Sequence, residues 1–401
     1  MFTKSETNNA IVARLTNVRK HPNADRLQLA DVLGTQVIVG LDSKEGDLVL
    51  YFDSNLRLSA EYIRANNLSS CTDLNADPKA KGHFPKTGRV RAQKLRGEFS
   101  NGFVANVTSL LVLPQLTNID VGMFVEGLEF THVKDVEICS KYVPILPTQN
   151  GFVGKHKRKK VRFVIENFWQ HWDTKQVMRN LFLFETPRTC YIEEKIHGTS
   201  GRTGYLKVKC NRPWWKFWIP REEWKVVSGT RRVDSINGHI STVRKAVEDQ
   251  IGPKLHKGEQ VYYEIFGYAG DKAIQPEFTY GCRPGEFKVL IYRVTITTED
   301  GQCYDLDRLQ VYVRAHQLGY ACAAIKHISL MDAEQVVELC KRVATSTESS
   351  TIDGGTMLEG IVIWFQDSFG NWVALKHKTN AFLEKTSKQM DEGTQDAEDY
   401  N

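Results

Sequence analysis

The sequence has no apolar run long enough to cross a bilayer, and its first residues, MFTKSETNNA, lack the apolar core of a secretory signal. Its eight cysteines are scattered, without a C-x-x-C pair and without histidines at the spacing of zinc ligands. These absences argue against a membrane-spanning, a secreted and a zinc-binding protein. We therefore expect an intracellular protein, in its own or a host's cytoplasm, with reduced cysteines and no membrane partner.

The chain also lacks an internal repeat and a strong excess of charge. Its 53 Lys and Arg residues exceed its 48 Asp and Glu residues by five, although the end of the chain, MDEGTQDAEDY, is acidic. A mild basic excess suits a polyanionic partner. Because 401 residues exceed what one hydrophobic core usually organises, we expect two domains, residues 1–150 and 151–401. The second would end in the short acidic tail. We expect the protein to be a monomer.

The N-terminal part contains short β-rich runs, AIVARLTNV, TQVIVGL and DLVLYF, and one helical stretch, SAEYIRANNL. This spacing predicts a small barrel or sandwich. Two segments, HPNADRLQLADV (His21–Val32) and KLRGEFSNGF (Lys94–Phe103), resemble the OB-fold tRNA-binding module of some synthetases and their cofactors. The resemblance implies an OB-type β-barrel that binds nucleic acid. We expect His21, Pro22 and Asp25 of this segment to shape a turn rather than to contact a ligand.

Two basic stretches could bind phosphates or simply be solvated. In GFVGKHKRKKVRF (Gly151–Phe163), six of thirteen residues are Lys or Arg, which suits either an interdomain linker or a phosphate contact. A second stretch carries seven basic residues and few acids: Lys79, Lys81, Lys86, Arg89, Arg91, Lys94 and Arg96.

From about Phe163 the pattern becomes mixed α+β. Helices are predicted at STVRKAVEDQIGPKL and MDAEQVVELCKRVAT, and strands at QVYYEIFGY, FKVLIYRVTI, GIVIWF and NWVALKHK. The last two strands are joined by QDSFG, a hairpin-like loop that ends in Gly370.

Lysines and carboxylates mark the chemistry of this second part. Lys195 follows a strand in YIEEKIHGTS, and a lysine can act as a nucleophile where burial or nearby positive charge keeps its amine neutral. Lys376 and Lys378 are two apart on a strand, so they share one face and could provide that charge or bind phosphate. Glu264 and Glu359 stand at strand boundaries, where they could serve a divalent cation or pair with an arginine.

The order of these motifs resembles the covalent nucleotidyltransferases: RNA ligases, DNA ligases and capping enzymes. KIHG with Thr and Ser after it is most similar to motif I of the RNA ligase 2-like branch, and the N-terminal OB-like module resembles a smaller branch that seals nicks with a 3′-OH on an RNA strand. The resemblance implies an ATP-grasp-like adenylation domain, ATP and Mg²⁺ or Mn²⁺ as cofactors, and RNA or RNA/DNA ends as substrates. After motif V, little of the chain remains for a C-terminal OB or helical domain.

Residue roles follow from the resemblance. Lys195 would be the adenylated nucleophile, and Lys376 and Lys378 would neutralise charge on the α-phosphate. His197 replaces the more common aspartate of motif I and would help AMP leave the lysine. Glu264 would bind the ribose, an aromatic (Phe287 or Tyr292) would stack on adenine, and Glu359 would serve the metal. The remaining predicted nucleotide contacts are Glu193, Gly198 and Arg231.

Two alternatives remain at this point. A capping-type guanylyltransferase would use GTP, and a binding protein would hold RNA through the OB module without catalysis. The insert NRPWWKFWIPREEW, with Trp214, Trp215, Trp218 and Trp224, could stack on bases or pack beneath a sheet. An NAD⁺-dependent DNA ligase is disfavoured because no nicotinamide-binding segment and no zinc-binding cysteines are recognisable.

Overall fold

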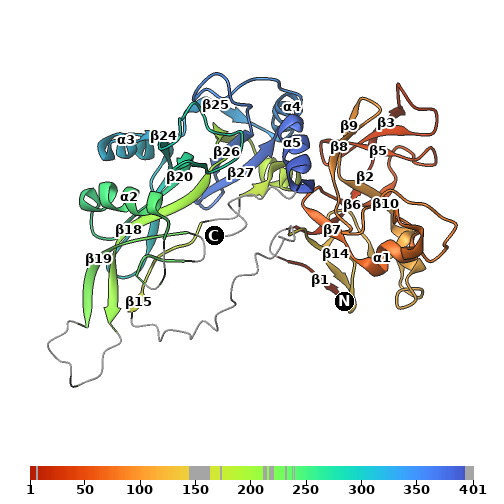
Figure 1. Ribbon diagram of the computed structural model, residues 1–401, viewed down its shortest axis with the longest axis horizontal. Helices are drawn as coiled ribbons and strands as arrows, with labels where there is room; N and C mark the ends of the chain where they lie inside the picture. Colours follow the sequence, from red (N-terminus) through yellow and green to blue (C-terminus); the bar gives the residue numbers. More distant parts are fainter. Residues whose placement is uncertain are drawn as a thin grey trace.

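The computed structural model describes residues 1–5, 8–143, 163–171, 174–210, 215, 221–230, 233–236, 238 and 240–392. Figure 1 shows a strand-rich N-terminal part beside a larger mixed α+β part. The predicted boundary at 150/151, nearly all of the basic segment Gly151–Phe163, Arg231, Trp214, Trp218 and most of the acidic tail lie outside the described residues. Among the described residues, no helix is both long and apolar enough to span a bilayer. The eight cysteines are free thiols, as predicted.

The N-terminal part is built from short antiparallel strands. They form a four-stranded sheet in the order β10-β6-β2-β11 and several smaller sheets. The pairing among the described residues gives separate sheets, so the OB-type barrel remains a prediction. The strands are β1 (Phe2–Thr3), β2 (Ala10–Arg14), β3 (Thr16–Lys20), β4 (Gln28–Val32), β5 (Thr35–Val39), β6 (Leu48–Phe52), β7 (Leu56–Leu58), β8 (Ala92–Leu95), β9 (Glu98–Asn101), β10 (Phe103–Asn106), β11 (Glu129–Phe130), β12 (His132–Val133), β13 (Val136–Glu137) and β14 (Cys139–Lys141).

The central strands of this part are buried on both faces. In β2, Ala10 and Val12 pack into one apolar cluster, whereas Ile11 and Ala13 pack into another. Side chains alternate between the two faces of a strand, so a strand between two cores is a continuous apolar run. The predicted helix is α1 (Ala60–Ala65), capped by the Ser59 hydroxyl, which accepts a hydrogen bond from the Tyr62 N–H.

The HPNAD segment forms a turn that holds the β8–β9 hairpin. His21 is fully buried, with Nε2 at 3.3 Å from the Leu95 carbonyl oxygen, and its Nδ1 accepts a hydrogen bond from the Asn23 N–H at 3.1 Å. The Asn23 amide donates to the Arg96 carbonyl at 2.9 Å. The two segments that carry the OB resemblance therefore contact each other, and the structural interpretation of His21 is confirmed.

The C-terminal part contains two sheets. The larger has the path β15-β18-β20-β22-β23 with β19, β21 and β24 beside it, and the smaller has the order β16-β27-β26-β17-β25. The predicted hairpin is β26–β27, with Gly370 at φ +82° in its turn. The strands are β15 (Phe163–Ile165), β16 (Lys175–Gln176), β17 (Arg188–Lys195), β18 (Thr199–Cys210), β19 (Glu222–Gly229), β20 (Glu259–Ala269), β21 (Lys272–Ala273), β22 (Phe287–Thr297), β23 (Cys303–Asp305), β24 (Ala321–Cys322), β25 (Ile325–Met331), β26 (Gly360–Gln366) and β27 (Trp372–Lys378).

In the part of the chain that the structure describes, the α-helices that accompany these sheets are α2 (Thr242–Ile251), α3 (Arg308–Leu318), α4 (Ala333–Ala344) and α5 (Asn380–Asp391). The helices α2 and α4 confirm the two predictions. The sequence analysis missed α3, although Asp307 and Gln310 form a capping box at its start, and it missed α5, which begins at the Thr379 cap.

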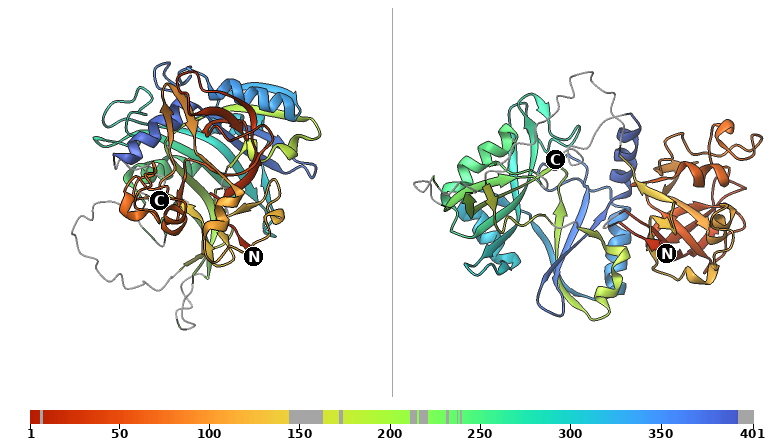
Figure 2. Two further views of the ribbon diagram at one scale, coloured as in Figure 1. Left: turned by 90° about the vertical axis from the view of Figure 1, so that its right-hand side faces the viewer. Right: turned by 90° about the horizontal axis from the view of Figure 1, so that it is seen from below.

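Helix α5 lies between the two parts of the molecule (Figure 2). Asp391 pairs with Arg89 at 2.6 Å and with Arg91 at 3.0 Å, and Glu384 pairs with Lys94 at 3.4 Å. Three of the seven basic residues in the second charged stretch therefore bind a helix of this same chain.

Candidate active site

The predicted lysines converge because three strands of the smaller sheet are in register. Lys195, at the end of β17, lies opposite Gly360 on β26, and Gly360 lies opposite Lys378 on β27. A Cβ atom at Gly360 would lie 2.1 Å from the His377 carbonyl oxygen, so the close approach of the strands requires glycine. Lys195 and Lys378 thus flank a residue without a side chain.

Glu359, just before this glycine, joins the two lysines. Its carboxylate oxygens lie 3.1 Å from Lys195 Nζ and 3.0 Å from Lys378 Nζ, and the side chain is fully buried. Burial raises the pKa of Glu359, but the positive charges of Lys195 and Lys378 outweigh that effect and lower it to about 2. Glu359 is therefore ionised at neutral pH and is a poor proton acceptor.

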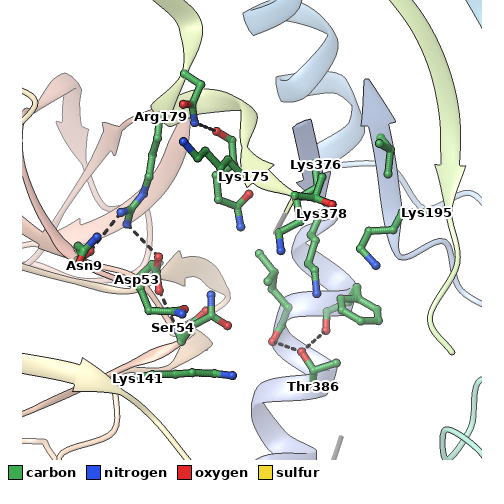
Figure 3. Close-up of a pocket in the computed structure, with 18 of the residues that line it drawn as sticks. Asn9, Asp53, Ser54, Lys141, Lys175, Arg179, Lys195, Lys376, Lys378 and Thr386 are labelled. Atoms are coloured by element: carbon green, nitrogen blue, oxygen red, sulfur yellow. Dashed lines mark hydrogen bonds and ion pairs between the residues drawn. The ribbon is translucent and has the colours of Figure 1, made fainter. Parts of the chain in front are cut away.

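A cavity of about 1060 Å³ borders this ion cluster and extends from the smaller sheet to the N-terminal part (Figure 3). Glu359 itself is not among its lining residues. Lys195, Lys376 and Lys378 all line it, which agrees with the prediction that the Lys376–Lys378 pair shares a face. Lys195 Nζ lies beside a carboxylate, however, with Glu359 at 3.1 Å. Apolar and aromatic side chains also line the cavity, among them Ile196, Leu290, Tyr292, Val362 and Trp364.

Glu264 also lines the cavity and accepts a hydrogen bond from the Gly198 N–H at 3.0 Å. Gly198 is needed for close packing, because a Cβ atom there would lie 2.3 Å from the Ile265 carbonyl oxygen. Gly198 is not among the lining residues of this cavity, so its predicted direct contact with a nucleotide is not supported by the geometry.

His197 is buried behind the cavity wall. Its ring lies edge-on to the rings of Phe278 and Phe382, each at a centroid distance of 5.0 Å, and its backbone N–H donates to the Tyr280 hydroxyl at 2.8 Å. Phe382 lines the cavity and also lies 4.6 Å from Lys378 Nζ. The geometry places the His197 ring against Phe382 and outside the cavity lining, and its predicted help in AMP release stays a prediction.

The aromatic beside the cavity is Tyr292, not Phe287. Phe287 packs against the core of the larger sheet with Val289 and Ile291, whereas Tyr292 lines the cavity and its hydroxyl lies 2.6 Å from His171 Nδ1. The β22–β20 register pairs Ile291 and Arg293 with consecutive residues of β20, which makes Tyr292 the extra residue of a β-bulge. Of the two predicted candidates, the geometry therefore favours Tyr292 over Phe287.

Glu193 supports the wall instead of lining it. Its carboxylate pairs with the buried guanidinium of Arg308, which lies over the ring of Trp364 at 4.3 Å. Burial is the largest influence on Glu193 and raises its pKa to about 7, against the lowering effect of Arg308. The neighbouring Glu194 is the lining residue, and it accepts hydrogen bonds from the Thr351 N–H and hydroxyl.

We expect Arg308→Leu to lower the free energy of unfolding by about 3–5 kcal/mol, because Glu193 would lose its partner inside the protein. Urea unfolding of the variant measures this loss. Arg342→Leu, at an exposed position of α4, is the control and should change stability little. Equal effects of the two substitutions would contradict a structural role for the pair.

Sequence reasoning also missed Arg244. This buried residue of α2 donates to the Thr199 hydroxyl at 2.7 Å and to the Ser200 carbonyl at 3.0 Å, and both of these residues line the cavity. The only signal was a basic residue on the apolar face of a predicted helix. Arg231 lies outside the described residues, so the predicted contact of the VSGTRR segment stays a prediction.

No protein-family model matches the chain, and no match was found among curated proteins. Solved structures do match it. Naegleria gruberi RNA ligase with PPi has a TM-score of 0.59 at 15% identity, over 95% of this chain and 99% of that one. A mutant of that ligase with ATP and Mn gives 0.59 at 14% identity, over 97% and 99%, and another with AMP and Mn gives 0.55 at 14%, over 94% and 98%. This chain therefore has the fold of an RNA ligase along nearly its whole length.

Proposed function

We propose that the chain is an ATP-dependent RNA ligase that joins 3′-OH and 5′-phosphate ends through lysyl-AMP and adenylated 5′-end intermediates. The observation that carries the proposal is the meeting of Lys195 and Lys378 at the buried Glu359 carboxylate, beside a cavity that both lysines and several apolar side chains line. A nucleotide fits such a cavity with its base against the apolar side chains and its phosphates among the lysines. Solved structures of the Naegleria gruberi RNA ligase include complexes with ATP, AMP or PPi.

In the first step, Lys195 Nζ would attack the α-phosphate of ATP, forming a nitrogen–phosphorus bond as pyrophosphate leaves. Lys376 and Lys378 would stabilise negative charge on the transferred phosphate, because phosphoryl transfer is mainly a matter of positioning and charge. AMP would then pass to a 5′-phosphate, and a 3′-OH would attack that end and release AMP. With its low pKa, Glu359 would act by charge and not as a base.

A divalent cation would have to reach Glu359 past the two lysines, because this carboxylate is fully buried and is not among the residues that line the cavity. Among the described residues, no three His, Cys, Asp or Glu side chains gather as a metal centre. A cation held by one carboxylate, substrate phosphates and water is the usual arrangement for Mg²⁺. Glu359 would be that carboxylate, and the cation would add positive charge next to Lys195 and the phosphates.

The position of Tyr292 beside the cavity leads to a prediction about ATP binding. We expect Tyr292→Ala to weaken ATP binding about 10- to 100-fold, because a base loses its stacking partner. Phe287→Leu should leave ATP binding nearly unchanged, because its side chain packs in the core. The measurement is the ATP concentration that gives half-maximal formation of the protein–AMP adduct. A larger effect at Phe287 than at Tyr292 would contradict the assignment.

The substrate proposal is tested with nicked duplexes that carry a labelled 5′-phosphate. We expect ATP-dependent sealing when the 3′-OH strand ends in RNA, and weaker sealing when it is entirely DNA. Sealing without ATP, or none with any end although the protein forms its adduct, would contradict this substrate. A role in RNA repair would follow from sealing at nicks.

A further inference from the structure

A row of lysines leads away from the nucleophile across the smaller sheet. Lys195 lies on β17, Lys378 and Lys376 on β27, and Lys175 on β16, which pairs in parallel with β27. All four line the cavity, and Figure 3 shows them in succession from Lys195 toward the N-terminal part. In the proposed reaction Lys195, Lys376 and Lys378 serve the transferred phosphate, so Lys175 extends the row beyond the space that this phosphate occupies.

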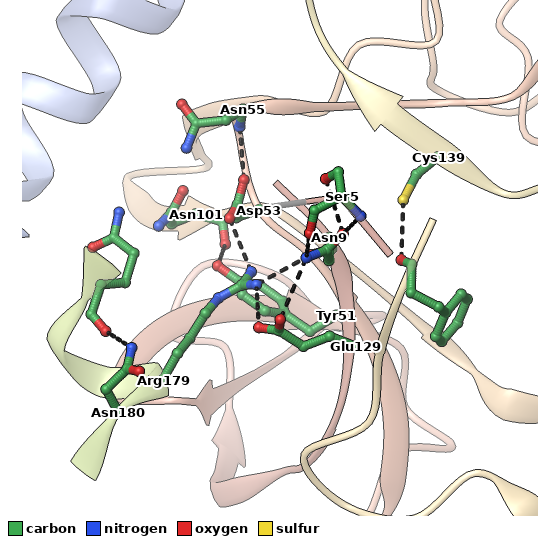
Figure 4. Close-up of polar contacts among 12 residues, drawn as sticks. Ser5, Asn9, Tyr51, Asp53, Asn55, Asn101, Glu129, Cys139, Arg179 and Asn180 are labelled. Atoms are coloured by element: carbon green, nitrogen blue, oxygen red, sulfur yellow. Dashed lines mark hydrogen bonds and ion pairs between the residues drawn. The ribbon is translucent and has the colours of Figure 1, made fainter. Parts of the chain in front are cut away.

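The N-terminal part supplies the facing wall. Lys141, at the end of β14, lies across the cavity from the row, together with Ser54 (Figure 3). This wall is held in place by Arg179, which pairs with Asp53 at 2.9 Å and with Glu129 at 3.4 Å (Figure 4). Because Arg179 lies between Lys175 and the 181–184 turn, the contact fixes both relative to the N-terminal part.

An exposed aromatic side chain lines the cavity on the side of the N-terminal part, and it does not pack into the core of the smaller sheet. In the 3₁₀ turn Leu181–Phe184, the other three residues pack into the core of the smaller sheet. Phe182 is instead 62% exposed and lines the cavity. Exposing a phenylalanine forgoes the favourable burial that its three neighbours obtain. Its position suggests that a ligand covers the ring.

We propose that Phe182, Lys175 and Lys141 hold the polynucleotide strand that carries the 5′-phosphate. The inference rests on the proposed ligase function and extends it from the reacting end to the following nucleotides. Lysines that follow a phosphate backbone and an aromatic ring on which a base stacks are the usual elements of single-strand binding, and they read no particular sequence. The lysine row places the terminal phosphate at Lys195 and the next nucleotides toward Phe182.

The test is a titration of a short 5′-phosphorylated RNA, labelled at a blocked 3′ end, without nucleotide or divalent cation so that no transfer occurs. We expect Phe182→Ala to weaken binding about tenfold, and Phe182→Trp to restore it. Phe369→Ala is the matched control, because Phe369 is 88% exposed in the β26–β27 turn and does not line this cavity. Lys175→Ala should reduce the slope of log affinity against log salt by about 0.7.

Equal RNA affinities of the Phe182→Ala and Phe369→Ala variants would overturn the inference. It would also be overturned if Lys175→Ala left the salt slope unchanged but raised the ATP concentration needed for adduct formation, since Lys175 would then bind the triphosphate. Both results leave the ligase proposal standing if wild-type protein forms its AMP adduct. Absence of that adduct would refute the ligase proposal itself.

Discussion

Lys195→Ala is expected to abolish covalent nucleotide transfer and the sealing of 5′-phosphate ends. The lysine supplies the only atom that bonds to AMP in the proposed first step, and loss of a nucleophile typically costs on the order of 10⁴-fold or more. The measurement is sealing of a labelled nick with ATP. Lys44→Ala, at an exposed position of the N-terminal part, is the control and should seal like wild type.

The same variant should still seal ends that were adenylated beforehand, because the last step needs no nucleophile from the protein. This outcome separates loss of the nucleophile from loss of the fold. If Lys195→Ala sealed 5′-phosphate ends at a normal rate with ATP, another group would carry the AMP and the proposed chemistry would be wrong.

Glu359→Gln should reduce adduct formation by about 10²–10³-fold, the usual cost of removing one electrostatic contact to a transition state. The substitution keeps the size of the side chain but leaves Lys195 and Lys378 without the carboxylate that lies 3.0–3.1 Å from both. A rate equal to that of wild type would exclude a role for Glu359 in the reaction. Glu338→Gln, on the exposed side of α4, is the matched control.

The same substitution should change the pH dependence of stability. The pKa of Glu359 falls from an ordinary 4.5 to about 2 in the folded protein. A lowered pKa contributes stability that is present above the unfolded value and is lost as pH falls through the folded value. Wild type should therefore exceed Glu359→Gln by on the order of 3 kcal/mol at pH 7, and the difference should shrink between about pH 4.5 and 2. A difference independent of pH would contradict the ion cluster.

The lysine cluster could be predicted because its geometry follows from local rules. Two lysines at an interval of two share a strand face, and this inference needs only the period of a β-strand. The placement of Lys376 and Lys378 on the cavity with Lys195 agrees with it. The contact of Glu359 with Lys195 and Lys378 was not predicted, because it depends on how β26 pairs with β17 and β27.

The aromatic could not be chosen from the sequence. Phe287 and Tyr292 are five residues apart, so in a regular strand they point to opposite faces, and the sequence does not tell which face borders the cavity. The β-bulge at Tyr292 also interrupts the regular alternation of side chains between the two faces of β22. His197 illustrates the same limit, because its motif position indicates chemistry while its burial depends on Phe278 and on Phe382 of a helix that was not predicted.

The basic stretch from Lys79 to Arg96 shows that a run of positive charge does not by itself identify the partner of those charges. Arg89, Arg91 and Lys94 suited a phosphate backbone or a solvated face, and instead they pair with Asp391 and Glu384 of α5. Those partners are about 300 positions away in the sequence, for example 302 for Arg89 and Asp391. Long-range pairing of this kind leaves no local pattern.

The most direct test of the account is the intact mass of the purified protein after incubation with Mg²⁺ and, separately, ATP, GTP or NAD⁺. The account predicts an increase equal to one AMP with ATP and none with Lys195→Ala. An increase equal to one GMP would instead favour a capping-type guanylyltransferase. No adduct with any nucleotide, in protein shown to be free of AMP at the start, would contradict the ligase account and favour an RNA-binding protein without catalysis.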